Sequence, residues 1–167
     1  MNIKNQNKNV VFLSQSAMIA ALYVILTFLA SSLGLASGSI QIRFSEALTI
    51  LPFFTPAAVP GLAVGCLLSN ILTGCAVPDV IFGTLATLIG AFGTLKIKKH
   101  KWLTPLPPIA ANTVIVPLVL YYAYGIRPIW MSFITVGIGE IISCGILGLL
   151  LQKSLQKYAS RLFTPQY

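Results

Sequence analysis

Long runs of apolar residues alternate with short polar stretches along most of the chain. Four runs favour helices that cross a bilayer, for which about 20 residues are needed; they cover residues 10–31, 80–95, 103–124 and 129–151. The stretch 46–76 between the first two runs is also apolar, but Pro52, Pro56 and Pro60 interrupt it, and proline breaks or kinks helices. The pattern alone allows this stretch to cross the membrane once or twice.

The basic residues decide between one and two crossings. Nine of the 11 lie in three groups: Lys4 and Lys8; Lys96, Lys98, Lys99 and Lys101; Lys153, Lys157 and Arg161. Short cytoplasmic loops collect Lys and Arg, and all three groups share one side only if residues 46–76 cross twice. We therefore predict an all-α membrane protein, a bundle of six transmembrane helices with both termini cytoplasmic. The second helix, near 45–55, is expected to be short or irregular.

The same pattern predicts a single integral membrane domain over residues 1–167. It consists of a cytoplasmic N-terminal segment at 1–9, the six-helix bundle at 10–151 and a cytoplasmic tail at 152–167. The first apolar run is longer than the core of a secretory signal, so it is expected to be a retained helix.

Composition narrows the function classes. Of 167 residues, 56% are hydrophobic and 8% charged, too few charges for a water-facing surface. This excludes a soluble enzyme, a disordered chain and a nucleic-acid module, and the three basic groups account for the net charge of +8. The sequence lacks a phosphate-loop motif, has one histidine and spaces its three cysteines without a motif. We expect no ATPase site, no metal and no cofactor, with the cysteines packing as small apolar side chains.

Glu140 is the acid that the sequence places deepest in the membrane. It stands 11 residues into the last run, about 16 Å deep at 1.5 Å per residue. An ionisable group at that depth indicates a functional role by default. The alternative is a structural role, in which the protonated acid forms a hydrogen bond to a neighbouring helix. Gly137 and Gly139 remove side-chain bulk nearby, so a flat ligand is expected to approach the backbone there.

Four other charged residues fall on the predicted outer side. Glu46 and Asp79 each stand where a helix begins and either cap it or contribute to a site. Arg43 stands three residues before Glu46, a spacing that allows the two to form an ion pair. Arg127 is assigned to a loop or headgroup contact.

Uncharged residues supply further candidates. Asn70 and Asn112 either bond neighbouring helices or recognise the edge of a heterocycle, since an amide both donates and accepts. Tyr121 and Trp130 belong either to the aromatic belt at the interface or to a wall on which a planar ligand stacks.

Two pairs of small residues allow helices to approach closely. Gly61 and Gly65 are expected to serve packing within the bundle, and Ala17 and Ala21 are also available to a partner subunit.

Residues 41–61, QIRFSEALTILPFFTPAAVPG, closely resemble the QueT family of queuosine-precursor transporters. The similarity continues through residues 65–70 and 78–87. Members of this family are substrate-binding S components of energy-coupling factor (ECF) transporters.

The resemblance implies a multi-pass protein of a bacterial plasma membrane that captures a 7-deazaguanine, such as queuine or its cyano or aminomethyl precursors. Its implied partners are a transmembrane coupling subunit, which docks on the AxxxA pattern of Ala17 and Ala21, and two cytoplasmic ATPase subunits. The chain itself is then a transport subunit and not an enzyme. The alternatives are an S component for another heterocyclic vitamin, or a membrane-embedded structural or enzymatic subunit.

Under this interpretation Glu140 reads the base, because a carboxylate accepts from N1–H and the exocyclic amino group together. Asn70 and Asn112 are the amide partners, and Tyr121 and Trp130 offer aromatic faces. The outer rim or gate is expected to consist of Arg43, Glu46 and Asp79, with the loop between the first two helices as a lid.

Overall fold

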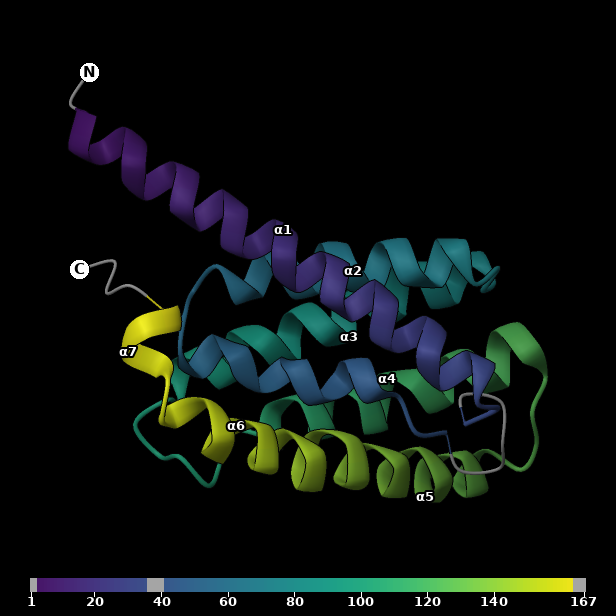
Figure 1. Cartoon of the computed structure of the whole chain (residues 1–167). Helices are drawn as coiled ribbons and strands as arrows, with labels where there is room; N and C mark the ends of the chain where they lie inside the picture. The colour runs from purple at the N-terminus through teal and green to yellow at the C-terminus, as the bar shows by residue number, and fades with distance from the viewer. Residues whose placement is uncertain (1–2, 36–40, 164–167) are drawn as a thin grey trace.

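The computed structural model describes residues 3–35 and 41–163. Within these residues all regular elements are helices, and they pack side by side (Figure 1). In chain order they are α1 (Ile3–Ser32), η1 (Phe44–Phe53), α2 (Ala58–Leu72), α3 (Val77–Lys96), α4 (Leu106–Tyr124), α5 (Ile129–Glu140), η2 (Ile141–Leu147), α6 (Gly148–Gln156) and α7 (Ala159–Leu162). The η1 segment is a 3₁₀ helix, and η2 is a π-helix that joins α5 to α6.

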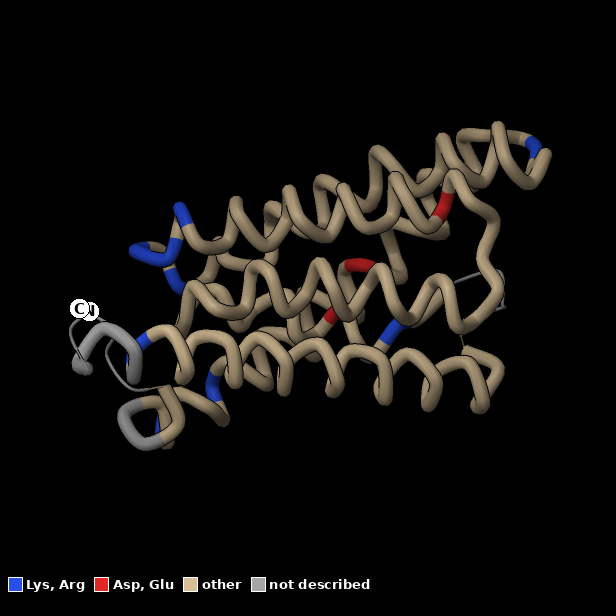
Figure 2. Tube along the Cα trace, turned by 90° about the horizontal axis from the view of Figure 1, so that it is seen from above, with Lys and Arg blue, Asp and Glu red and all other residues tan. Residues whose placement is uncertain are grey.

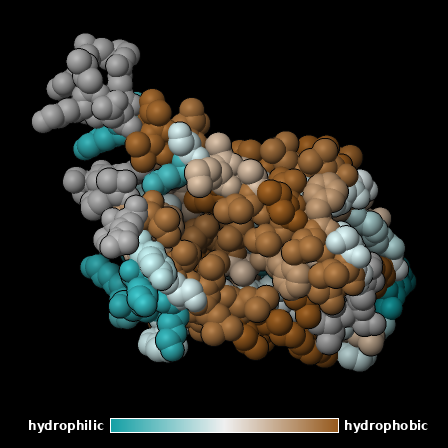
Figure 3. Space-filling view, in the orientation of Figure 1, coloured by the Kyte–Doolittle hydropathy of each residue, from teal (hydrophilic) through white to brown (hydrophobic). Residues whose placement is uncertain are grey.

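Four segments are long and apolar enough to cross a bilayer: Lys8–Ser32, Val77–Lys96, Leu106–Tyr124 and Ile129–Gln156. Their outward side chains are largely apolar, and Figure 3 shows a broad hydrophobic band with hydrophilic side chains toward the ends of the bundle. The prediction of an all-α membrane protein is confirmed. The two remaining apolar helices, η1 and α2, have 10 and 15 residues.

The predicted short or irregular second helix is η1, and it lies inside the bundle. Every residue from Ser45 to Pro52 is buried, and the segment packs against α1, α2, α3, α6 and η2. A 3₁₀ helix rises about 2.0 Å per residue, so its ten residues cover about 20 Å. This central position brings the polar side chains of η1 within reach of several helices.

The glycine pair of α2 serves packing within the bundle, as predicted. A Cβ on Gly65 would lie 2.7 Å from Cβ of Tyr23, and one on Gly61 would lie 2.7 Å from a backbone oxygen of α1. Both distances are too short for a side chain, so α1 and α2 pack closely only because these residues are glycine. In contrast, Ala17 and Ala21 are exposed on α1.

The charges divide along the bundle. Figure 2 shows lysines and arginines concentrated at the end where α1 begins and α6 ends, with the acids away from that end. The connection between α3 and α4 carries three lysines, directly after Lys96 at the end of α3, and it turns at the same end (Figure 1). The three basic groups of the sequence are therefore carried by segments that meet at one end of the molecule.

Candidate functional site

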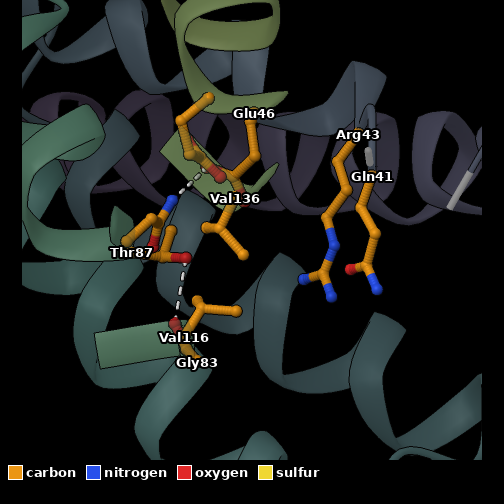
Figure 4. Close-up of a pocket in the computed structure, with 9 residues that line it drawn as sticks. Gln41, Arg43, Glu46, Gly83, Thr87, Val116 and Val136 are labelled. Carbon is orange, nitrogen blue, oxygen red and sulfur yellow. Dashed lines mark hydrogen bonds between the residues drawn. The ribbon is translucent and has the colours of Figure 1, made fainter. Parts of the chain in front are cut away.

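A polar cavity lies between η1, α3, α4 and α5 (Figure 4). Its volume is about 20 Å³, which is room for about one water molecule. The side chains and backbone around it come from Gln41, Arg43, Glu46, Gly83, Thr87, Asn112, Val116, Val136 and Glu140. The predicted candidates Arg43, Glu46, Asn112 and Glu140 thus meet in one place.

Glu46 is held by side chains from two helices. Its carboxylate accepts hydrogen bonds from the Tyr23 hydroxyl of α1 and from Asn112 Nδ2 of α4, the latter at 3.3 Å. Only 2% of its surface is exposed. Glu46 stands in the first turn of η1, as predicted. Its carboxylate, however, lies within the bundle and bonds Tyr23 and Asn112 instead of capping a helix at the outer side.

Glu140 ends α5, directly before the π-helix η2. Cys144 Sγ donates to its Oε2 at 3.1 Å and lies 3.4 Å from the backbone oxygen of Glu46. Cys144 thus does more than the apolar packing expected of it. π-Helices are rare and frequently mark functional sites, and this one begins directly after Glu140 and contains Cys144.

One oxygen each from Glu46 and Glu140 and the Cys144 sulfur lie within 4.8 Å of one another, all on buried residues. These are atom types that bind metals. Here they already take part in hydrogen bonds with Tyr23, Asn112 and each other, so the cluster is a connected set of acceptors and donors.

Arg43 and Gln41 approach the cavity from the segment before η1. The backbone N–H of Arg43 donates to Ser143 Oγ of η2 at 3.2 Å, and the two side chains point the same way in Figure 4. The structure records no ion pair between Arg43 and Glu46. Arg43 therefore presents its guanidinium to the cavity, while its backbone ties the segment to η2.

The space beside Gly139 is filled by the protein itself. A Cβ at this position would collide with the backbone oxygen of Gln41, whereas Gly137 faces the Thr113 methyl group, 3.4 Å from where a Cβ would lie. In this structure the backbone at Gly139 is covered by Gln41 and is not open to a flat ligand. Gly139 instead allows the segment that begins at Gln41 to pack against α5.

Several residues of this region were not predicted from the sequence as site candidates. Thr87 Oγ1 donates to the backbone oxygen of Gly83 at 3.1 Å, and both residues line the cavity. Gln41 is the first residue of the stretch 41–61 that resembles the family. This resemblance was the sequence signal that could have marked Gln41 as a site residue. For Tyr23, one tyrosine in an apolar run, the sequence held no signal.

Asn70 and Asp79 lie together but not on the cavity. Asn70 Nδ2 is 3.5 Å from the backbone oxygen of Asp79, and the Tyr124 hydroxyl donates to Asp79 Oδ2 at 3.3 Å. A Cβ on Gly83 would lie 3.1 Å from Asn70 Nδ2, so Asn70 sits behind the wall that Gly83 forms. The two residues join α2, α3 and α4.

The aromatic candidates are also separate from the cavity. Trp130 is 62% exposed. Tyr121 packs edge-on against Tyr122, with ring centroids 5.0 Å apart, and the Arg127 guanidinium lies 5.2 Å from its ring centroid. The predicted lid, the loop between the first two helices, includes residues 36–40, which lie outside the described residues.

Comparisons with known proteins identify relatives. A family model described as QueT transporter matches residues 13–157. A curated protein of Lactococcus lactis subsp. cremoris (strain MG1363), named Queuosine precursor transporter QueT, is 42% identical over 73 residues. That match spans 44% of this chain and 43% of the relative, so it covers less than half of the relative's length. No solved structure matches the chain.

Proposed function

Since the chain belongs to the QueT transporter family and is a multi-pass protein of a bacterial cell membrane, we propose that it captures a queuosine precursor for import. It acts as the substrate-binding S component of an energy-coupling factor transporter. The single observation that carries the proposal is the family match over residues 13–157, and the buried polar cavity supports it.

The chemistry of the cavity suits a guanine-like edge. A 7-deazaguanine presents N1–H and an exocyclic amino group as donors and O6 as an acceptor. Glu140 accepts from the two donors as a charge-assisted pair, while Asn112 or the Arg43 guanidinium donates to O6. Leaving such buried groups unpaired costs about 1–3 kcal/mol each, which gives the site its preference for this edge.

The second carboxylate, Glu46, extends the range of ligands. An aminomethyl substituent on the 7-position carries a positive charge, and Glu46 lies within 4.8 Å of the Glu140 carboxylate that reads the base. Val116 and Val136 line the same cavity and offer apolar contact to the ring faces. The side chains around the cavity therefore suit both a neutral and a cationic precursor.

Binding requires the cavity to widen. A volume of about 20 Å³ is far too small for a bicyclic base, so the ligand displaces side chains or the segment 41–43. That segment is bonded to η2 from Arg43 N–H to Ser143 Oγ and to Leu35 through the Ile42 N–H, and it packs on Gly139. It is the part of the cavity wall that lies outside the helices.

The orientation follows from the basic end of the bundle. Lysines and arginines gather where α1 begins and α6 ends (Figure 2), and such residues mark the cytoplasmic side. With η1 and α2 as the two short crossings, the bundle has six crossings and both termini in the cytoplasm. The ligand then enters from the opposite, outer end.

Energy comes from partner subunits in this proposal. Ala17 and Ala21 are exposed on α1, and small residues there permit close approach of another helix. This supports docking of a transmembrane coupling subunit, which in turn binds two cytoplasmic ATPases.

The test is equilibrium binding of queuine and its cyano and aminomethyl precursors to detergent-purified protein. We expect saturable binding of at least one of the three. Glu140→Gln should weaken it at least tenfold, about 1.4 kcal/mol. Asp79→Asn, a matched acid-to-amide change outside the cavity, should change affinity by less than about twofold.

Two results would overturn the proposal. One is saturable binding of another heterocyclic vitamin with no binding of the three precursors, which would reassign the substrate. The other is an equal loss of affinity in Glu140→Gln and Asp79→Asn with intact folding, which would move the site away from the cavity.

A further inference from the structure

A second, larger hollow lies at the basic end of the bundle, between α6 with the adjoining turn of η2 and the connection from α3 to α4. Its volume is about 680 Å³, and it opens to the surface. The residues that matter to its chemistry are Lys101, Trp102, Ile146, Leu150, Gln152 and Lys153. We call it the α6 groove.

The α6 groove carries positive charge that this chain's acidic side chains do not neutralise. Lys101 and Lys153 line it, and the chain has three acidic residues. Two of them line the central cavity, and the third, Asp79, bonds Tyr124 at the end of α4. The lysines therefore favour an anion brought from outside the chain.

Gln152 adds a buried donor to the same groove. The side chain is 3% exposed, and its Oε1 accepts from Thr104 Oγ1 at 3.0 Å. Among the described residues, Nε2 of Gln152 has no hydrogen-bond partner. Buried amide nitrogens almost always have one, so this nitrogen indicates an acceptor that the chain does not supply.

The remaining lining is apolar. Ile146 and Leu150 are 54% and 58% exposed and lie toward the middle of the bundle from Gln152 along one helix. Trp102 is 83% exposed beside the basic connection, the position typical of interfacial tryptophan. The groove is thus cationic at the end of the bundle and apolar toward its middle.

We propose that the α6 groove binds one anionic phospholipid. Its phosphate lies between Lys101 and Lys153 and accepts a hydrogen bond from Gln152 Nε2. Its acyl chains lie over Ile146 and Leu150. The proposal concerns a site apart from the central cavity, and it does not depend on which molecule the protein transports.

The test uses the whole chain in phosphatidylcholine nanodiscs, with phosphatidylglycerol titrated in and bound lipid counted by native mass spectrometry. We expect a single saturable phosphatidylglycerol molecule. Lys101→Gln and Lys153→Gln should each weaken it about fivefold. Lys99→Gln, an exposed lysine of the same connection that does not line the groove, should have less than about a twofold effect.

Gln152→Leu separates the hydrogen bond from general charge. It keeps the side chain's approximate size and removes the buried amide, while the Thr104 hydroxyl still has the Lys101 backbone oxygen as an acceptor at 2.7 Å. Phosphatidylglycerol binding should therefore weaken while the melting temperature in phosphatidylcholine is retained. If this variant fails to fold, the lysine series still decides the question.

Four results would overturn the proposal. Equal binding of phosphatidylglycerol and phosphatidylcholine, or an equal loss in Lys99→Gln, would show no specific headgroup site. Displacement of the lipid by millimolar inorganic phosphate would indicate a small-anion site. A cross-link from Leu150→Cys to the coupling subunit, without phosphatidylglycerol preference, would assign the groove to a protein partner.

Discussion

Glu46 and Glu140, from η1 and the end of α5, bring carboxylate oxygens within 4.8 Å of each other inside the bundle. Like charges at this distance repel strongly in a low-dielectric interior. Donors from several elements surround the pair: Tyr23 and Asn112 bond Glu46, and Cys144 bonds Glu140. The geometry of the acids therefore depends on each of these donors.

Removal of the Tyr23 hydroxyl tests this dependence. Tyr23→Phe keeps the Cβ that packs on Gly65 and leaves one carboxylate oxygen of Glu46 without its donor. We expect a loss of about 1–3 kcal/mol in stability, measured by thermal unfolding in detergent, together with weaker ligand binding. Tyr122→Phe, at an 80% exposed position, is the control, and an equal effect in both variants would contradict the prediction.

The packing of the segment 41–43 on α5 predicts a second effect. Gly139→Ala places a methyl group against the Gln41 backbone oxygen, which forces the segment and the Arg43 side chain away from the cavity. We expect overpacking to cost about 1–3 kcal/mol and ligand affinity to fall.

Gly145→Ala is the matched control for this change. Its nearest neighbours would lie 3.8 Å from the new Cβ, an ordinary contact, and alanine favours the helix more than glycine does. Ligand affinity that falls equally in both variants would show that segment 41–43 does not shape the site.

The long helices and the acid deep in the membrane were both predicted correctly from the sequence, because both depend on local properties. The uncharged runs are long enough to span a bilayer, and an acid in the middle of such a run is unusual wherever it points. Glu140 was found in this way. Glu46 was expected at a rim because the first charges after α1 suggest an outer loop, but η1 folds back into the bundle.

The remaining features arise from tertiary packing. The 3₁₀ form of η1 depends on the helices that enclose it, and the π-helix after Glu140 adapts α5 and α6 to their contacts. Asn70 and Asn112 look alike in the sequence, each an amide in an apolar run. Only the packing of α2 and α4 decides which one faces the cavity.

The proposed docking of a coupling subunit on the exposed alanines of α1 gives a further prediction. Ala17→Leu combined with Ala21→Leu adds bulk to a face that packs against no described element. We expect loss of co-purification with the coupling subunit and of ATP-dependent uptake, while ligand affinity of the isolated chain stays unchanged. Ala110→Leu, an exposed position on α4, is the control; a partner retained by the double variant would place docking elsewhere.

The two asparagines predict the clearest contrast for the cavity. Asn112 lines it and lies 3.3 Å from a Glu46 oxygen, so Asn112→Ala removes a donor to the acid and an amide that faces the ligand. We expect ligand affinity to fall at least tenfold, about 1.4 kcal/mol. Asn70 provides the contrast. It is as buried as Asn112 but lies behind Gly83, with its amide near Cys66 Sγ and the Asp79 backbone oxygen. Asn70→Ala should therefore lower the melting temperature while affinity changes by less than about twofold. Titration of both variants with the same queuosine precursor measures the contrast, and a larger loss in Asn70→Ala would move the binding site from the cavity to the junction of α2 and α3.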